Sequence, residues 1–161
     1  MVLLRDTALK APDPALSSLW QVMIPFANGK AVLFAESVTL TWTKVPAEAR
    51  FADGKHQYYP GFAELDGITI TFYETHDHKV GNWLQEWQRL VYDSESGIYG
   101  YPAKYKQDIT VNLFSKFSKS PAKIVTYNRC WPTDKGPYEL NYSEETGRIT
   151  IQAQFATDKV K

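Results

Sequence analysis

The feature that most constrains this chain is the alternation of apolar and polar residues in short segments. In residues 68–74, Ile68, Ile70 and Phe72 alternate with two threonines and a tyrosine. Successive side chains of a strand point to opposite faces of a sheet, so a period of two predicts a strand with one buried face. Residues 148–156 repeat the pattern. The chain is therefore predicted to be built mainly from antiparallel sheet.

Further strands are predicted from the same period. They lie at residues 19–25, 37–43, 107–115 and 122–130, with a shorter one at 138–142. Asn28-Gly29 follows the first of them, and both residues tolerate the positive φ angles of a tight hairpin turn. We therefore predict that residues 30–36 return as the strand that pairs with residues 19–25.

One segment has a helical period. Val80, Trp83, Leu84, Trp87 and Val91 recur at a spacing of three and four residues, which places them on one apolar stripe. Asp77 precedes the stripe and is predicted to cap it, and a stretch rich in glycine and proline follows. The pattern predicts an amphipathic helix over residues 79–92.

About seven strands and one helix, in the order strands, helix, strands, predict the fold class. It is an antiparallel β sandwich or barrel with the amphipathic helix packed against it. A chain of 161 residues has the size of one domain, which we assign to residues 18–157. Residues 1–17 contain Pro12 and Pro14 and are predicted to form an N-terminal arm that orders on a partner.

Residues 45–66 form a long connection with unusual composition. They contain Phe51, Tyr58, Tyr59 and Phe62, together with the turn pair Asp53-Gly54. Asp-Gly favours a tight turn, so we predict a protruding two-stranded hairpin. A long connection in a compact domain usually has a function, and exposed aromatic side chains indicate a contact with a partner.

Charge and cysteine content exclude several classes of protein. Eighteen basic and eighteen acidic residues give a formal net charge of zero, which argues against a dedicated nucleic-acid-binding protein and slightly favours self-association. A single cysteine, Cys130, excludes an internal disulfide framework and is predicted to be a buried, inert thiol. The sequence has neither a secretory signal nor an apolar run long enough to span a membrane, so we expect production in a cytoplasm.

Only one cluster suggests catalytic or metal chemistry. His76 and His78 lie between Glu74 and a helix start, and with His56 they are candidate zinc ligands. The alternative, that these are polar residues of a turn, is favoured. At a junction between a strand and a helix, two residues at this spacing need not point their side chains toward one metal ion. Phosphate-binding loops and nucleophile elbows are absent from the sequence. We expect a protein that is not an enzyme, with no catalytic residue, metal or cofactor, and keep a small metal-dependent enzyme as the weakest alternative.

The order of landmarks resembles the tail tube proteins of contractile-tailed bacteriophages. In the first half the resemblance rests on Pro60-Gly61-Phe62, on the run from Asp66 to Glu74, and on the helix segment from Trp83 to Trp87. In the second half it rests on Tyr105-Lys106, Trp131-Pro132-Thr133, Gly136 and Glu139-Leu140. It covers roughly residues 18–157.

The resemblance implies a structural virion protein. Six copies would form a ring, and the rings would stack into a hollow tail tube through which the genome is ejected. Its partners would be identical rings, the tail sheath protein, and the baseplate or tube initiator and tail terminator proteins, with transient non-specific passage of DNA and no membrane insertion. It would be located in the phage tail, assembled in the host cytoplasm. The alternatives are a tube initiator or baseplate adaptor that forms the first ring, and the tube of a phage-derived device such as a tailocin.

Two sets of site residues follow from the resemblance. The arm and the long connection are expected to join stacked rings, through Asp13, Phe51, Asp53, Gly54, Tyr58 and Tyr59. Uncharged polar strand faces are expected to line the lumen, which DNA must cross without sticking. The candidates for the lumen are Thr69, Thr71, Thr150, Gln152 and Gln154.

Overall fold

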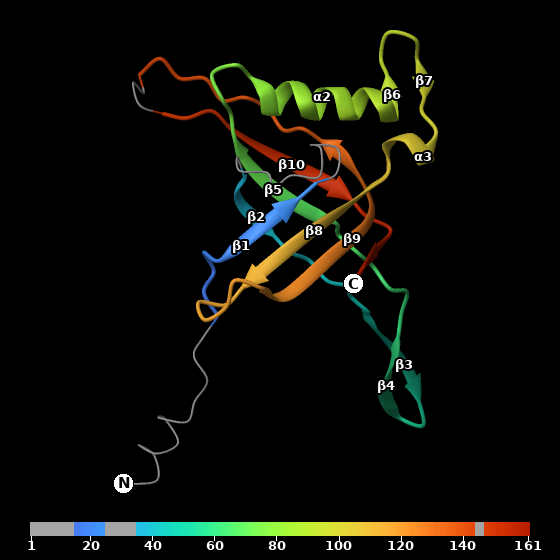
Figure 1. Cartoon of the computed structure of the whole chain (residues 1–161). Helices are drawn as coiled ribbons and strands as arrows, with labels where there is room; N and C mark the ends of the chain where they lie inside the picture. Colours follow the sequence, from blue (N-terminus) through green and yellow to red (C-terminus); the bar gives the residue numbers. More distant parts are fainter. Residues whose placement is uncertain (1–14, 25–34, 144–146) are drawn as a thin grey trace, which may run out of the picture.

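The computed structural model describes residues 15–24, 35–143 and 147–161, and most of their regular structure lies in one antiparallel sheet (Figure 1). Its strands are β1 (Trp20–Met23), β2 (Ala35–Thr39), β5 (Ile68–Tyr73), β8 (Gln107–Phe114), β9 (Pro121–Asp134), β10 (Thr150–Ala156) and β11 (Lys159–Val160). Two small hairpins, β3 (Ala47–Ala52) with β4 (Lys55–Pro60) and β6 (Tyr92–Asp93) with β7 (Ile98–Tyr99), stand outside it. The helices are α2 (Lys79–Val91) and α3 (Pro102–Tyr105).

The strand order of the sheet is β1-β8-β9-β10-β5-β2, with β11 paired to β9. The long strand β9 joins the two halves, because its first part pairs with β8 and its last residues pair with β10. Arg129, one residue before the last one that pairs with β8, has a φ of 57°, so the strand is irregular close to the point where it changes partner. A sandwich or barrel was predicted. Over the described residues, β1 and β2 remain at the two ends of the strand order and the sheet is not closed into a barrel.

The core is one cluster of buried residues from β1, β5, β8, β9, β10 and α2, and α2 lies at one end of the molecule (Figure 1). The alternation of apolar and polar residues correctly predicted which side chains of β5 and β10 are buried, since every second residue of both strands is buried. The helix stripe packs on these residues through aromatic contacts. Ring centroids are 5.8 Å apart for Phe72 and Trp83, and 5.4 Å apart for Trp87 and Phe155.

The predicted pairing of the first two strands is not found in the described residues. β1 pairs with β8, and β2 pairs with β5. The predicted turn at Asn28-Gly29 lies outside the described residues. β2 also ends at Thr39, short of the predicted residue 43, and Trp42 is 46% exposed. The backbone N–H and carbonyl of Thr41 instead bond to the Tyr127 hydroxyl, at 3.0 and 2.8 Å, so a side chain replaces the ladder there.

Residues 138–142 do not form the predicted strand. Leu140 is 75% exposed, and Tyr138 turns its hydroxyl toward Glu74, to which it donates a hydrogen bond of 2.7 Å. A short segment can be held by side-chain hydrogen bonds instead of a strand ladder. An alternation of only five residues does not distinguish a strand from such an irregular segment.

The cap of α2 differs from the prediction. The N-cap residue is His78 in the left-handed region, with no hydrogen bond from its side chain, and Asp77 is not the cap. The carboxylate of Glu74, directly after β5, caps the helix instead. It accepts hydrogen bonds from the backbone N–H groups of Val80 at 3.1 Å and Gly81 at 2.8 Å. The unpaired N–H groups of a helix start are thereby satisfied.

Gly81 is required for this arrangement. A Cβ added to Gly81 would lie 1.9 Å from the hydroxyl oxygen of Tyr138 and 2.7 Å from a carboxylate oxygen of Glu74. The glycine therefore lets β5, α2 and the segment after β9 meet at one carboxylate.

Partial burial tends to raise the pKa of Glu74, but hydrogen bonds from the Tyr138 hydroxyl and three backbone N–H groups lower it below its ordinary value. The same carboxylate, together with burial, raises the pKa of Tyr138 to about 12. Because the pKa of Glu74 is lower in the folded state, its carboxylate stabilises the protein at pH values above its unfolded-state pKa. This contribution is lost as the pH falls through the folded-state pKa.

Replacing Glu74 with glutamine is expected to lower the free energy of unfolding at pH 7 by about 1 kcal/mol, the usual cost of a lost helix cap. The deficit should begin to shrink below about pH 4.5, where the carboxylate of the unfolded chain takes up a proton, and it should vanish as the pH falls through the lower pKa of the folded state. Urea unfolding at pH 7 and pH 3 measures both differences. Glu86→Gln, at an exposed position of α2, is the control. A deficit of equal size at both pH values would contradict the assignment.

Candidate assembly surfaces

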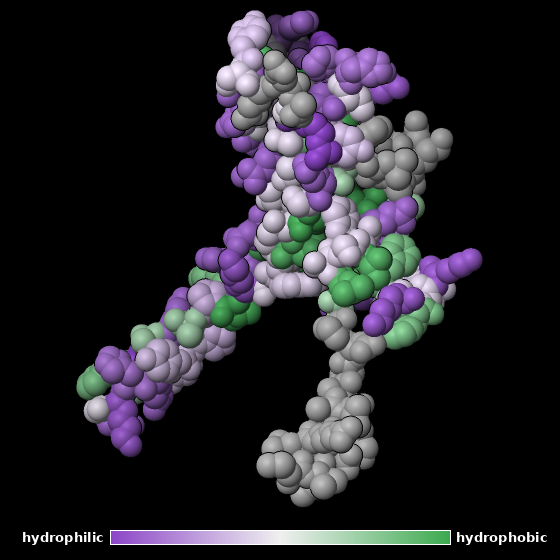
Figure 2. Space-filling view, turned by 90° about the vertical axis from the view of Figure 1, so that its left-hand side faces the viewer, coloured by the Kyte–Doolittle hydropathy of each residue, from purple (hydrophilic) through white to green (hydrophobic). Residues whose placement is uncertain are grey.

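The hairpin of β3 and β4 projects away from the body of the protein (Figures 1 and 2). Its turn is formed by Asp53 and Gly54, with φ angles of 52° and 73°. These are two of the predicted contact residues, and their positive φ angles suit the tight turn that joins two twisted strands. Every residue of β4 is exposed, as is all of β3 except Ala52.

The register of the hairpin separates its side chains into two faces. Phe51 lies opposite His56, with ring centroids 5.5 Å apart, and Ala49 lies opposite Tyr58. One face is therefore largely apolar, and Phe51 and Tyr58 are 71% and 72% exposed on it. The opposite face is polar and consists of Glu48, Arg50, Ala52, Lys55, Gln57 and Tyr59.

Tyr59 is thus separated from the other two predicted aromatic contacts. The guanidinium of Arg50 lies 5.4 Å from the centre of its ring, and its hydroxyl donates to the Gln57 side chain at 2.7 Å. These contacts hold Tyr59 on the polar face. The apolar face, with its exposed aromatic rings, is the one suited to burial against another protein.

The base of the hairpin is firmly joined to the body. The backbones of Lys44 and Glu64 exchange two hydrogen bonds of 2.8 Å, and the Gly61 N–H donates to the Pro46 carbonyl at 2.7 Å. The Lys44 ammonium also forms an ion pair with Asp66. The hydrogen bond to the Asp66 carboxylate, together with its negative charge, raises the pKa of Lys44. The hairpin is consequently presented from a fixed base.

A second surface is the polar face of β10, β5 and β2. Gln152 lies opposite Thr71 and Gln154 opposite Thr69, and β2 adds Ser37 and Thr39 in the same rows. Alternation directs these side chains away from the core, because their neighbours in sequence are buried. Thr150 lies one row further, opposite Tyr73. All five predicted lumen residues therefore lie on one face of one sheet.

This face carries few charges. At one end, the Arg148 guanidinium lies over the ring of Tyr73 at 5.4 Å and pairs with Glu36 at 3.2 Å. The rows of threonine, serine and glutamine between the strands are uncharged. Such a surface is hydrated, but it neither attracts nor repels phosphate groups strongly.

The edges of the sheet are a third surface. In the described part of the chain, β1 is paired only with β8, and β2 only with β5. An edge strand presents backbone donors and acceptors that pair readily with another chain. Asp13, the remaining predicted contact residue, lies outside the described residues.

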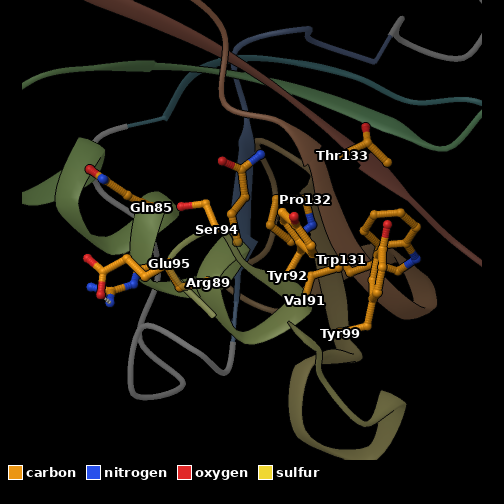
Figure 3. Close-up of a pocket in the computed structure, with 11 residues that line it drawn as sticks. Gln85, Arg89, Val91, Tyr92, Ser94, Glu95, Tyr99, Trp131, Pro132 and Thr133 are labelled. Carbon is orange, nitrogen blue, oxygen red and sulfur yellow. Dashed lines mark ion pairs between the residues drawn. The ribbon is translucent and has the colours of Figure 1, made fainter. Parts of the chain in front are cut away.

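A groove of about 610 Å³ lies between α2, the hairpin of β6 and β7, and β9 (Figure 3). Tyr92, Tyr99 and Trp131 lie on one side of it, and Arg89 and Glu95 on the other. The rings of Tyr92 and Tyr99 are 4.8 Å apart. The sequence did not predict this site; the tyrosines at residues 92, 99 and 101 were its only trace in the sequence, and they do not show that α2 and β9 lie beside them.

The histidines do not converge. His76 pairs with Asp77 at 2.7 Å, whereas His78 stacks on Tyr138 with ring centroids 6.3 Å apart. The described residues contain no group of three or more histidine, cysteine, aspartate or glutamate side chains placed to hold a metal ion. Cys130 is buried as predicted, and burial raises its pKa to about 11. Across the described residues, every helix is too short or too polar to cross a membrane.

Comparisons with known proteins give matches in sequence and in fold. A family model described as phage tail tube protein matches residues 17–159. Tail tube protein gp19 of Enterobacteria phage T6 is 25% identical over 99 residues, which is 61% of this chain and 61% of that relative. The chain thus aligns with less than two thirds of the length of this curated relative.

Solved structures match over more of the chain. The sheath/tube terminator of an extracellular contractile injection system, PVC, in the extended state has a TM-score of 0.73 and 14% identity, over 94% of this chain and 97% of that one. The tube-terminating cap of the anti-feeding prophage has the same score and identity, over 94% and 91%. At this identity the likeness is one of fold.

Proposed function

Because this chain belongs to the phage tail tube protein family, we propose that it is the repeating subunit of the inner tube of a contractile tail. In this proposal six copies form a ring, and rings stack into a hollow conduit for DNA. The protein acts by assembly and not by catalysis. Its place is the tail of the phage particle, built in the host cytoplasm.

The uncharged face of β10, β5 and β2 is the observation that carries the proposal. A conduit for DNA must neither bind phosphate groups, as lysine and arginine would, nor repel them strongly. Thr69, Thr71, Gln152 and Gln154 form adjacent rows on this face, away from the core. We assign these residues, with Thr150, to the lumen.

The other surfaces supply the contacts that a tube needs. Edge strands at both ends of the sheet would pair with neighbouring copies, which removes exposed edges when a ring closes. The apolar face of the hairpin would reach an adjacent ring, with Phe51 and Tyr58 as its anchors and Asp53-Gly54 at its tip. Asp13, in the arm, would contribute a further contact between rings.

The surrounding partners follow from the same assignment. A tube inside a contractile tail contacts the sheath protein along its length, and its ends contact an initiator at the baseplate and a terminator. The PVC protein that this chain resembles in fold is a sheath/tube terminator. A ring at one end of the tube, such as the initiator, is therefore the second candidate function.

Electron microscopy of the purified protein tests the proposal. We expect negatively stained samples at high concentration to contain hollow tubes of stacked rings, and dilute samples to contain shorter tubes or rings. Assembly should depend on concentration because each contact is between identical copies. Single rings at every concentration would contradict the repeating subunit and favour the second candidate.

A further inference from the structure

The groove beside α2 has two chemically different sides (Figure 3). Tyr92, Tyr99 and Trp131 present aromatic rings, and Tyr92 and Tyr99 are 43% and 77% exposed. Across the groove, the closest atoms of Arg89 and Glu95 are 3.7 Å apart, and both side chains are largely exposed. An exposed pair of this kind is weak, so Arg89 can exchange its partner for another carboxylate at little cost.

Aromatic grooves of this composition suit proline-containing segments. Proline rings pack on the flat faces of tyrosine and tryptophan, and a proline segment loses little conformational entropy on binding. In Pro12-Asp13-Pro14 an acidic side chain lies directly between two prolines. Its two prolines match the aromatic side of the groove, and the carboxylate of Asp13 between them matches Arg89.

The groove of the same copy is out of reach for this segment. Ala15 is the first described residue, and an extended chain covers at most about 3.6 Å per residue, so Pro12 lies within about 11 Å of it. β1 begins at Trp20, opposite Leu113, whereas Trp131 of the groove follows Cys130, which lies opposite Gln107. Leu113 and Gln107 lie near the two ends of β8, six residues apart, which is about 20 Å in a strand. The occupant must come from a second copy.

We propose that Pro12-Asp13-Pro14 of one copy binds in the groove of another, with the prolines on Tyr92, Tyr99 and Trp131 and with Asp13 facing Arg89. This contact rests on the proposed function and names its partner segment. The two contributing surfaces lie at different ends of the protein, so the contact is head-to-tail. A head-to-tail contact between stacked rings leaves the arms unused at one end of the tube and the grooves unused at the other, and this gives the assembly a direction.

Disulfide trapping between two differently tagged full-length variants tests the contact. Asp13→Cys is mixed with Arg89→Cys, and the cross-linked heterodimer is measured on a non-reducing gel. Cys130 is buried and should not compete. The control acceptor is Glu86→Cys, at an exposed position of the same helix that is not among the residues lining the groove. We expect at least about tenfold more heterodimer with residue 89, because binding raises the local concentration of the two thiols.

A second pair of variants separates the groove from the general surface. Adding Tyr99→Ala to the Arg89→Cys chain should remove most of the heterodimer, whereas Tyr101→Ala should not. Tyr101 is 75% exposed, close to the 77% of Tyr99, but does not line the groove. Equal yields for residues 89 and 86, or equal effects of the two tyrosines, would overturn the inference. Tubes seen by electron microscopy in the same samples would then leave the proposed function standing.

Discussion

Replacing Trp87 with alanine is expected to lower the free energy of unfolding by about 3 to 5 kcal/mol, the usual range for a large buried aromatic residue. Trp87 has no exposed surface, and its ring lies against Phe155 and Trp83. Its indole nitrogen donates a hydrogen bond of 2.7 Å to the Tyr105 carbonyl. The substitution would leave a cavity between helix and sheet and a carbonyl without this donor.

Urea unfolding followed by circular dichroism measures the loss without depending on tryptophan fluorescence. Trp83→Ala should cost less, because Trp83 is only partly buried. Trp42→Ala is the matched control, since Trp42 is 46% exposed and packs outside the core. A change near zero for Trp87→Ala would mean that the helix does not anchor on the sheet, and would contradict the described core.

Replacing the hairpin of β3 and β4 with a short glycine linker is expected to abolish tube assembly while the domain stays folded. The described side-chain contacts of Phe51, His56 and Tyr59 are within the hairpin. The linker would join Val45 to Gly61, which the hydrogen bonds at the base already bring together. Assembly should fail because a ring without hairpins loses its proposed contact with the next ring.

Two smaller variants sharpen this test. The double variant Phe51→Ala with Tyr58→Ala removes the aromatic rings of the apolar face. The control, Glu48→Ala with Gln57→Ala, also carries two alanine substitutions, but on the polar face. We expect sedimentation and electron microscopy to find tubes only for the second pair. Normal tubes from the first pair, or an unfolded protein after removal of the hairpin, would refute the role of this face.

Alternation predicted which residues form the core but not which strands are neighbours. Ile68, Ile70 and Phe72 are buried as expected, because a period of two fixes the face of each side chain. The same period says nothing about the partner across the ladder. Residues 35–39 therefore pair with β5, although turn chemistry favoured the strand at residues 19–25. Tertiary packing decides such pairings.

The candidate surfaces were predictable to different degrees. The rows that contain Thr69 and Gln154 follow from alternation once β5 and β10 are neighbours, and the hairpin turn follows from Asp53-Gly54. The separation of Tyr59 from Tyr58 also follows from alternation, since the two are consecutive in β4, whereas the residues opposite them depend on the register, which sequence alone did not supply. The groove was not predictable, because α2, β7 and the end of β9 contribute to it from distant parts of the chain.

The attachment of the hairpin has a mechanical consequence. Residues 40–46 and 61–67 connect its two ends to β2 and β5, which pair with each other through Thr39 and Thr69. A pull on the hairpin therefore draws both strands in the same direction and does not unzip them from each other. The load passes to the ladder between β5 and β10, where six residue pairs resist it in shear at the same time. If the hairpin joins stacked rings as proposed, this ladder carries the pull of the next ring into the rest of the sheet.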